Sequence, residues 1–149
     1  MNGIGTGTGL IPVTAATPDE QTISRPRRNR QSAKKAGSNF EAVVAEFLAF
    51  SLADDRIERR NKNGTKDRGD ITGVKSIRGG RIVVECKNYS SDRIQIRKWL
   101  DEAEAERGND DAALGVVAVK VRGDGNPASQ LVCMTLDTFA RLLEGGSAL

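Results

Sequence analysis

The stretch that decides the fold reads RIVVECK and occupies positions 81–87. Successive side chains of a β-strand point to opposite faces. The even-numbered residues, which are isoleucine, valine and cysteine, therefore share one apolar face that suits a protein core. Glu85 and Lys87 share the other face with a valine. The stretch thus predicts a buried strand from whose end a carboxylate and an ammonium group emerge side by side.

A second strand, DITGV at positions 70–74, precedes this one, and KSIRGG supplies the turn between them. If the two strands pair as a hairpin, Val74 lies opposite Arg81 and Asp70 lies opposite Glu85. Directly opposed side chains have Cβ atoms about 4.5–5.5 Å apart. Two carboxylates that close repel each other unless a cation lies between them. A hard divalent cation such as Mg²⁺ fits, because it binds one or two carboxylates together with waters and substrate phosphates.

Two further side chains have roles beside this pair. Lys87 would orient a water molecule or neutralise the charge that grows on a phosphate under attack. Glu41 lies at the border of the buried face of a helix predicted over 38–53, capped by Ser38 or Asn39, and would reach the same metal ion. The residues expected on that face are Phe40, Val43, Val44, Phe47, Leu48 and Leu52. The alternative interpretation of the Glu-x-Lys triplet is an ordinary surface ion pair.

The remaining patterns predict an α/β fold with a mixed sheet flanked by helices, in the order αβββαββα. A helix follows the deciding strand, with Asp92 as its cap, and Gly108 ends it. A nearly continuous apolar run indicates a strand covered on both faces. In order, the other elements are expected at 56–60 (strand), 92–107 (helix), 113–121 (strand), 131–135 (strand) and 136–144 (helix).

Gly69-Asp70, then fourteen residues, then Glu85-Cys86-Lys87 after an apolar strand, resembles the PD-(D/E)xK motif of the restriction-endonuclease-like nucleases. Within them, residues 37–121 are similar to the archaeal and phage-type Holliday junction resolvases. The resemblance implies that Asp70 and Glu85 are metal ligands, often joined by the carbonyl of Cys86. It further implies that Lys87 is the catalytic lysine and Glu41 the acidic residue of the helix. A glycine stands where the motif usually has proline.

The loop that leads into Asp70 is strongly basic, and beside a nuclease site it should grip phosphates. Gly64 lets its backbone approach a ligand closely. The alternative is a solvated loop without a partner. Its candidate DNA-binding residues are Arg59, Arg60, Lys62, Thr65, Lys66 and Arg68.

The chain is expected to comprise a disordered basic arm at 1–37 and a nuclease domain at 38–149. The arm would contact phosphates without sequence preference or serve only as a solubilising tail.

Composition excludes several other chemistries. The chain has no histidine, which rules out a Ser-His-Asp triad, a Cys-His dyad and His-ligated zinc. Its 2 cysteines, Cys86 and Cys133, lie in apolar runs and are expected to be reduced. Neither a membrane span nor a signal peptide is evident, so an intracellular, cytoplasmic protein is expected, whether encoded by a cell or by a virus of bacteria.

These observations predict a Mg²⁺-dependent endonuclease, with Mn²⁺ as a substitute metal and no nucleotide cofactor. The resemblance implies branched DNA, chiefly a four-way junction, as the substrate. Symmetrical cutting of a junction needs two active sites, so a homodimer is expected. Three alternatives stay open: a nuclease of the same fold acting in restriction or general repair, a catalytically silent DNA-binding protein, and a scaffold protein.

Overall fold

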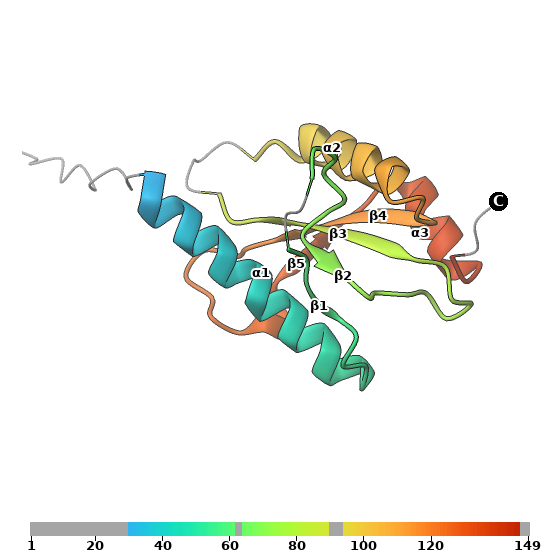
Figure 1. Ribbon diagram of the computed structural model, residues 1–149, viewed down its shortest axis with the longest axis horizontal. Helices are drawn as coiled ribbons and strands as arrows, with labels where there is room; N and C mark the ends of the chain where they lie inside the picture. The colour runs from blue at the N-terminus through green and yellow to red at the C-terminus, as the bar shows by residue number, and fades with distance from the viewer. Residues whose placement is uncertain (1–29, 62–63, 90–93, 147–149) are drawn as a thin grey trace, which may run out of the picture.

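The computed structural model describes residues 30–61, 64–89 and 94–146. In these residues three α-helices pack on a five-stranded mixed sheet, which makes the fold α/β (Figure 1). The predicted order αβββαββα is confirmed, with one short 3-10 helix added. The elements are α1 (Arg30–Leu52), β1 (Glu58–Arg59), β2 (Ile71–Thr72), β3 (Ile82–Lys87), α2 (Ile96–Asn109), β4 (Leu114–Val119), η1 (Pro127–Ser129), β5 (Leu131–Cys133) and α3 (Leu136–Leu143).

The strands lie across the sheet in their order along the chain, from β1 to β5. Neighbouring strands are antiparallel except β3 and β4, which are parallel and are joined by a crossover through α2. The strand that carries Glu85 and Lys87 therefore has a hydrogen-bonded neighbour on each side. This central place in the sheet holds both side chains on a fixed backbone.

The two long helices cover opposite faces of the sheet (Figure 1). Under α1, Phe40 and Val44 pack with Val84 of β3. Under α2, Trp99 packs in a second cluster with Val117 of β4. The predicted alternation of β3 and the predicted burial of β4 on both faces are therefore confirmed.

The first helix begins at Arg30, so its predicted start and its predicted cap at Ser38 or Asn39 are wrong. The stretch RQSAKKAG has no apolar spacing, but arginine, glutamine, alanine and lysine are good helix formers and simply extend the helix. The first turns of α1 thus replace the last part of the predicted arm. Residues 1–29 of that arm lie outside the described residues.

The buried face of α1 is rotated about the helix axis relative to the predicted face. Phe40 and Val44 are buried as expected, but Val43 and Leu52 are exposed and Ala45 is buried instead. The reason is that small alanine side chains on this face let the helix lie close to the sheet. The rotation leaves Glu41 at the edge of the interface, partly buried.

Both strands before β3 are shorter than predicted, with two residues each. The predicted strand at 70–74 ends early because Gly73 adopts φ 85°, a left-handed conformation that leaves strand geometry. An added Cβ at this glycine would lie 2.2 Å from the carbonyl oxygen of Arg56, so only glycine fits there.

The second helix begins at Ile96 after Gln95, whose side chain makes no capping hydrogen bond. The predicted cap, Asp92, lies outside the described residues. The helix continues through Gly108 to Asn109, two residues beyond the predicted end at 107, so the predicted stop at Gly108 is wrong. Boundaries of this kind depend on the last turn of hydrogen bonds rather than on the residue type alone.

The last helix turns apolar side chains outward. Leu136, Phe139 and Leu143 are exposed, although their spacing places them on one side of the helix. In residues 30–61, 64–89 and 94–146, neither this helix nor another is long and apolar enough to cross a membrane.

Candidate functional site

The hairpin of β2 and β3 brings Asp70 and Glu85 together. Ile71 pairs with Val84, which is the register that the sequence predicts and which sets Asp70 opposite Glu85. The other end of the predicted register is wrong. Lys75, and not Val74, pairs with Arg81, the residue just before β3. The extra residue is taken up as a bulge around the left-handed glycine that ends β2.

Both carboxylates are withdrawn from solvent, with exposed fractions of 3% for Asp70 and 8% for Glu85. The backbone N–H of Cys86 donates to Oδ2 of Asp70 at 2.9 Å, which orients that carboxylate along the strand. Burial raises the pKa of Glu85, an effect that the ammonium of Lys87 opposes and the charge of Asp70 reinforces. Two buried acids thus share one small region of the sheet.

The ammonium of Lys87 lies between two acids. Its Nζ donates to Oε1 of Glu85 at 2.8 Å and to Oε2 of Glu102, on α2, at 2.6 Å. Burial lowers the pKa of Lys87, but its hydrogen bonds to Glu102 and Glu85 outweigh that effect, so the pKa is raised overall. Lys87 is therefore a permanent cation near neutral pH and is not suited to accept a proton.

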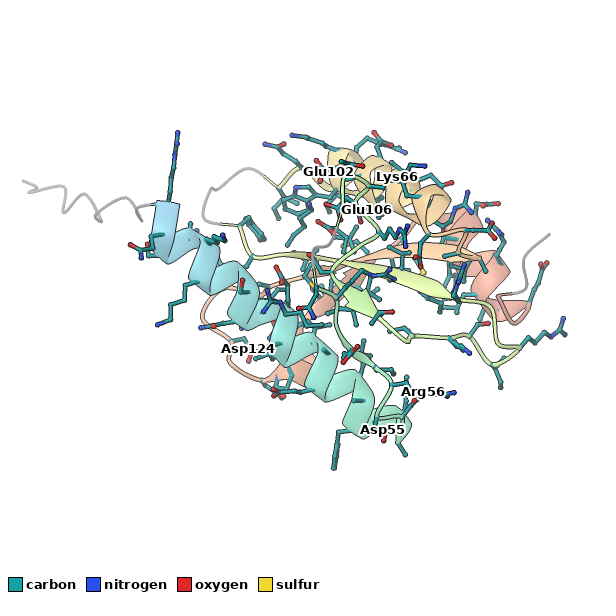
Figure 2. The ribbon with its side chains drawn as sticks, viewed as in Figure 1. Asp55, Arg56, Lys66, Glu102, Glu106 and Asp124 are labelled. Carbon is teal, nitrogen blue, oxygen red and sulfur yellow. The ribbon has the colours of Figure 1, made fainter. Side chains whose placement is uncertain are left out.

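The structure adds a buried acid that the sequence analysis missed. Glu106 extends from α2 toward the sheet and is 6% exposed (Figure 2). Its Oε2 and Oε2 of Glu85 are buried without a hydrogen-bond partner among the described residues. The signal was present in the sequence, because Trp99, Ala103 and Glu106 are spaced by four and three residues along one helix face.

The pKa of Glu106 is raised to about 9. Burial is the largest cause, and repulsion from the charge of Glu85 adds to it. A hydrogen bond to Glu85, which only a protonated Glu106 can donate, raises the pKa further. In the ionised state both groups only accept hydrogen bonds, which is why their facing oxygens have no partner. One proton between the two carboxyl groups relieves the repulsion in the metal-free chain.

The metal-free chain should lose stability as the pH rises. The pKa of Glu106 is about 9 when folded and 4.5 when unfolded, so between these pH values the folded chain holds a proton that the unfolded chain has released. We expect a loss on the order of 2 kcal/mol, or roughly 5–10 °C in Tm, between pH 5 and pH 9 in EDTA. Glu106→Gln should flatten this profile, and parallel melting profiles for the two proteins would contradict the assignment.

Glu41 lies on α1, where Oε2 accepts a hydrogen bond from Nε of Arg59 at 2.8 Å. Two residues predicted for different tasks, metal binding and DNA binding, thus form one ion pair. Glu41 still lies near the site, since its charge acts on the thiol of Cys86 together with those of Asp70 and Glu85. These charges add to burial, the largest effect, in raising the pKa of that thiol.

The predicted DNA-binding loop borders a pocket of about 280 Å³, lined by Arg60, Asn61 and residues 64–69. Thr65, Lys66 and Arg68 are exposed there. The carbonyl of Asp67 accepts a hydrogen bond from the side chain of Asn109, which ties the loop to α2.

The arginines at the start of this loop are engaged by acids. Arg60 donates to both carboxylate oxygens of Asp110, at 3.0 and 3.1 Å, and is partly buried there. That pairing makes it less suited to grip a phosphate than Lys66 or Arg68. Lys62, the other predicted contact, lies outside the described residues.

The described residues contain no group of three or more acidic or cysteine side chains arranged around one point as a metal cage. The assembled features are two opposed carboxylates, a third acid facing one of them, and a fixed ammonium beside a basic loop. The chain has no significant match among protein-family models, curated proteins or solved structures.

Proposed function

We propose that the chain is a Mg²⁺-dependent DNA endonuclease with a restriction-endonuclease-like core and a PD-(D/E)xK site. The observation that carries this proposal is the opposition of Asp70 and Glu85, next to the fixed ammonium of Lys87. All three lie on or beside a central strand, and a loop with exposed basic residues leads directly into Asp70. An ordinary surface ion pair would not bury two acids to this degree.

The donor set fits a hard divalent cation. Asp70 and Glu85 would hold it, and Oε2 of Glu85 is a buried oxygen without a hydrogen-bond partner among the described residues. When bound, Mg²⁺ or Mn²⁺ would polarise the scissile phosphate and lower the pKa of a water molecule. Lys87 contributes a positive charge where negative charge develops on the phosphate. Lys66 and Arg68 bind flanking phosphates and hold the strand in place.

Branched DNA is the proposed substrate, in particular a four-way junction. The polar, basic loop suits recognition of backbone and shape, because the chain has only one tyrosine and one tryptophan for stacking on bases. Two symmetrical cuts require two sites, so the proposal includes a homodimer acting inside the cell.

Cleavage of a four-way junction and of linear duplex of the same sequence, each with Mg²⁺ and with EDTA, tests this proposal. We expect Mg²⁺-dependent cutting of the junction at least about 100-fold faster than of the duplex. Equal rates would instead favour a restriction or general repair nuclease of the same fold. Binding without cutting would identify a silent DNA-binding protein, and neither activity would leave a scaffold protein.

The same assay on a plasmid-borne cruciform reports on the dimer. A dimer cuts both strands within one binding event, so linear product should appear without accumulation of nicked circles. Nicked circles that build up and convert slowly would contradict the homodimer and leave the nuclease standing.

A further inference from the structure

The carboxyl groups of Glu85 and Glu106 meet between β3 and α2, two elements that pack directly on one another. Each side chain is more than nine-tenths buried. In each, Oε2 has no hydrogen-bond partner among the described residues, while the two groups lie within hydrogen-bonding range of one another if one carries a proton. Oε2 of Glu85 and Oε2 of Glu106 are therefore two buried acceptors without a donor among the described residues.

Protein groups satisfy only part of this arrangement. Lys87 donates to Oε1 of Glu85 and leaves Oε2 of Glu85 without a hydrogen-bond partner among the described residues. The second acid bound by Lys87 is Glu102, one turn earlier on α2, so the ammonium does not compensate Glu106. A buried acid that lacks a partner is costly, and a cation between the two oxygens would remove that cost.

Gly69 packs closely beside the pair. A Cβ on this glycine would lie 2.6 Å from Cγ1 of Val83, 3.3 Å from the carbonyl oxygen of Val84 and 3.7 Å from Oε2 of Glu106. The residue before Asp70 is therefore a direct neighbour of Glu106, and no larger residue fits at this position.

Glu41, the acid that the family resemblance implies, is differently placed. Its Oε2 is bound by the guanidinium of Arg59, so using it for a metal would first require that ion pair to open. Glu106 has no such competing cation among the described residues.

From this geometry we infer that Glu106 is a further direct ligand of the divalent cation that Asp70 and Glu85 would hold. The inference rests on the proposed function for the identity of the ion, but the assignment of Glu106 does not depend on the DNA substrate. Carboxylate oxygens are the protein ligands that Mg²⁺ and Mn²⁺ prefer, and water or phosphate would fill the other positions.

Binding of Mn²⁺ to the full, DNA-free chain tests the inference, with free Mn²⁺ measured by electron paramagnetic resonance. We expect one ion per chain, and an affinity at least about tenfold weaker in Glu106→Gln. Glu104→Gln is the matched control, because Glu104 lies on the same helix but is exposed and pairs with Arg107; its affinity should stay within about twofold.

Unaltered affinity in Glu106→Gln would overturn the inference, since Glu85 and Glu106 would then share only a proton. Circular dichroism checks that the variant is folded, and Glu106→Asp, which keeps the charge but shortens the reach, provides a second measurement with the same expected direction. DNA cleavage is scored separately. Mn²⁺ bound through Glu106 without any cleavage would refute the nuclease alone, whereas cleavage with unaltered Mn²⁺ affinity in Glu106→Gln would refute this site alone.

Discussion

Asp70→Asn should leave the chain folded and reduce its Mg²⁺-dependent cleavage of DNA by roughly 1000-fold. An asparagine oxygen can still accept the hydrogen bond that the N–H of Cys86 donates to Asp70. The negative charge that would hold the cation opposite Glu85 is lost, however, and with it the pull on the phosphate. The measurement is the single-turnover cleavage rate at saturating enzyme, so that weaker DNA binding does not enter.

Asp55→Asn is the matched control, because Asp55 is exposed in the turn after α1 (Figure 2). It should cut at the unaltered rate. Lys87→Ala should also cut at least about 100-fold more slowly, since under the proposed function its fixed ammonium would stabilise the developing charge. Full cleavage by either site variant would show that the chemistry lies elsewhere in the chain.

Gly69→Ala should destabilise the chain by about 3 kcal/mol, far more than Gly79→Ala. Both glycines have nearly the same left-handed backbone, with φ 85° at Gly69 and 86° at Gly79. That backbone alone costs an alanine about 1–2 kcal/mol. At Gly79 an added Cβ meets nothing within 4 Å, whereas at Gly69 it would lie 2.6 Å from Cγ1 of buried Val83. The difference between the two variants therefore isolates the steric contribution.

Urea unfolding in metal-free buffer measures both free energies of unfolding. Equal losses at the two positions would mean that the sheet yields around the new methyl group. Gly69→Pro should be worse still, because proline fixes φ near −65° and cannot take the observed conformation. The glycine that replaces the motif's usual proline is thus required by the local backbone.

Much of the site followed from short-range pattern. Strand alternation alone placed Glu85 and Lys87 on one face. The predicted register also set Asp70 opposite Glu85, although the structure reaches that pairing through a bulge next to the turn. The same reasoning failed at the turn end of the hairpin. The bulge there lies at Gly73, whose backbone packs against the carbonyl oxygen of Arg56, and no local sequence pattern indicates that contact.

What the sequence did not reveal depends on contacts between distant residues. Glu106 continues the helix face of Trp99 and Ala103, but its charged residue type suggested an exposed position, and only its packing against the sheet shows that it is buried. Arg59 and Arg60 looked like free cations in a basic run, but Glu41 and Asp110 engage them across 18 and 50 residues of chain. The early start of α1 was missed because polar helix formers produce no apolar period.

The central place of β3 has a consequence for local opening of the fold. Its amides are enclosed by β2 and β4, so hydrogen exchange at Val83, Val84 and Glu85 should require unfolding of the whole sheet. The exposed loop at 64–68 has few such restraints and should exchange through small, frequent fluctuations. The proposed metal ligands and the proposed phosphate contacts would then belong to two cooperative units of unequal stability. The first would keep the acidic groups aligned, and the second would adjust to the shape of a bound ligand.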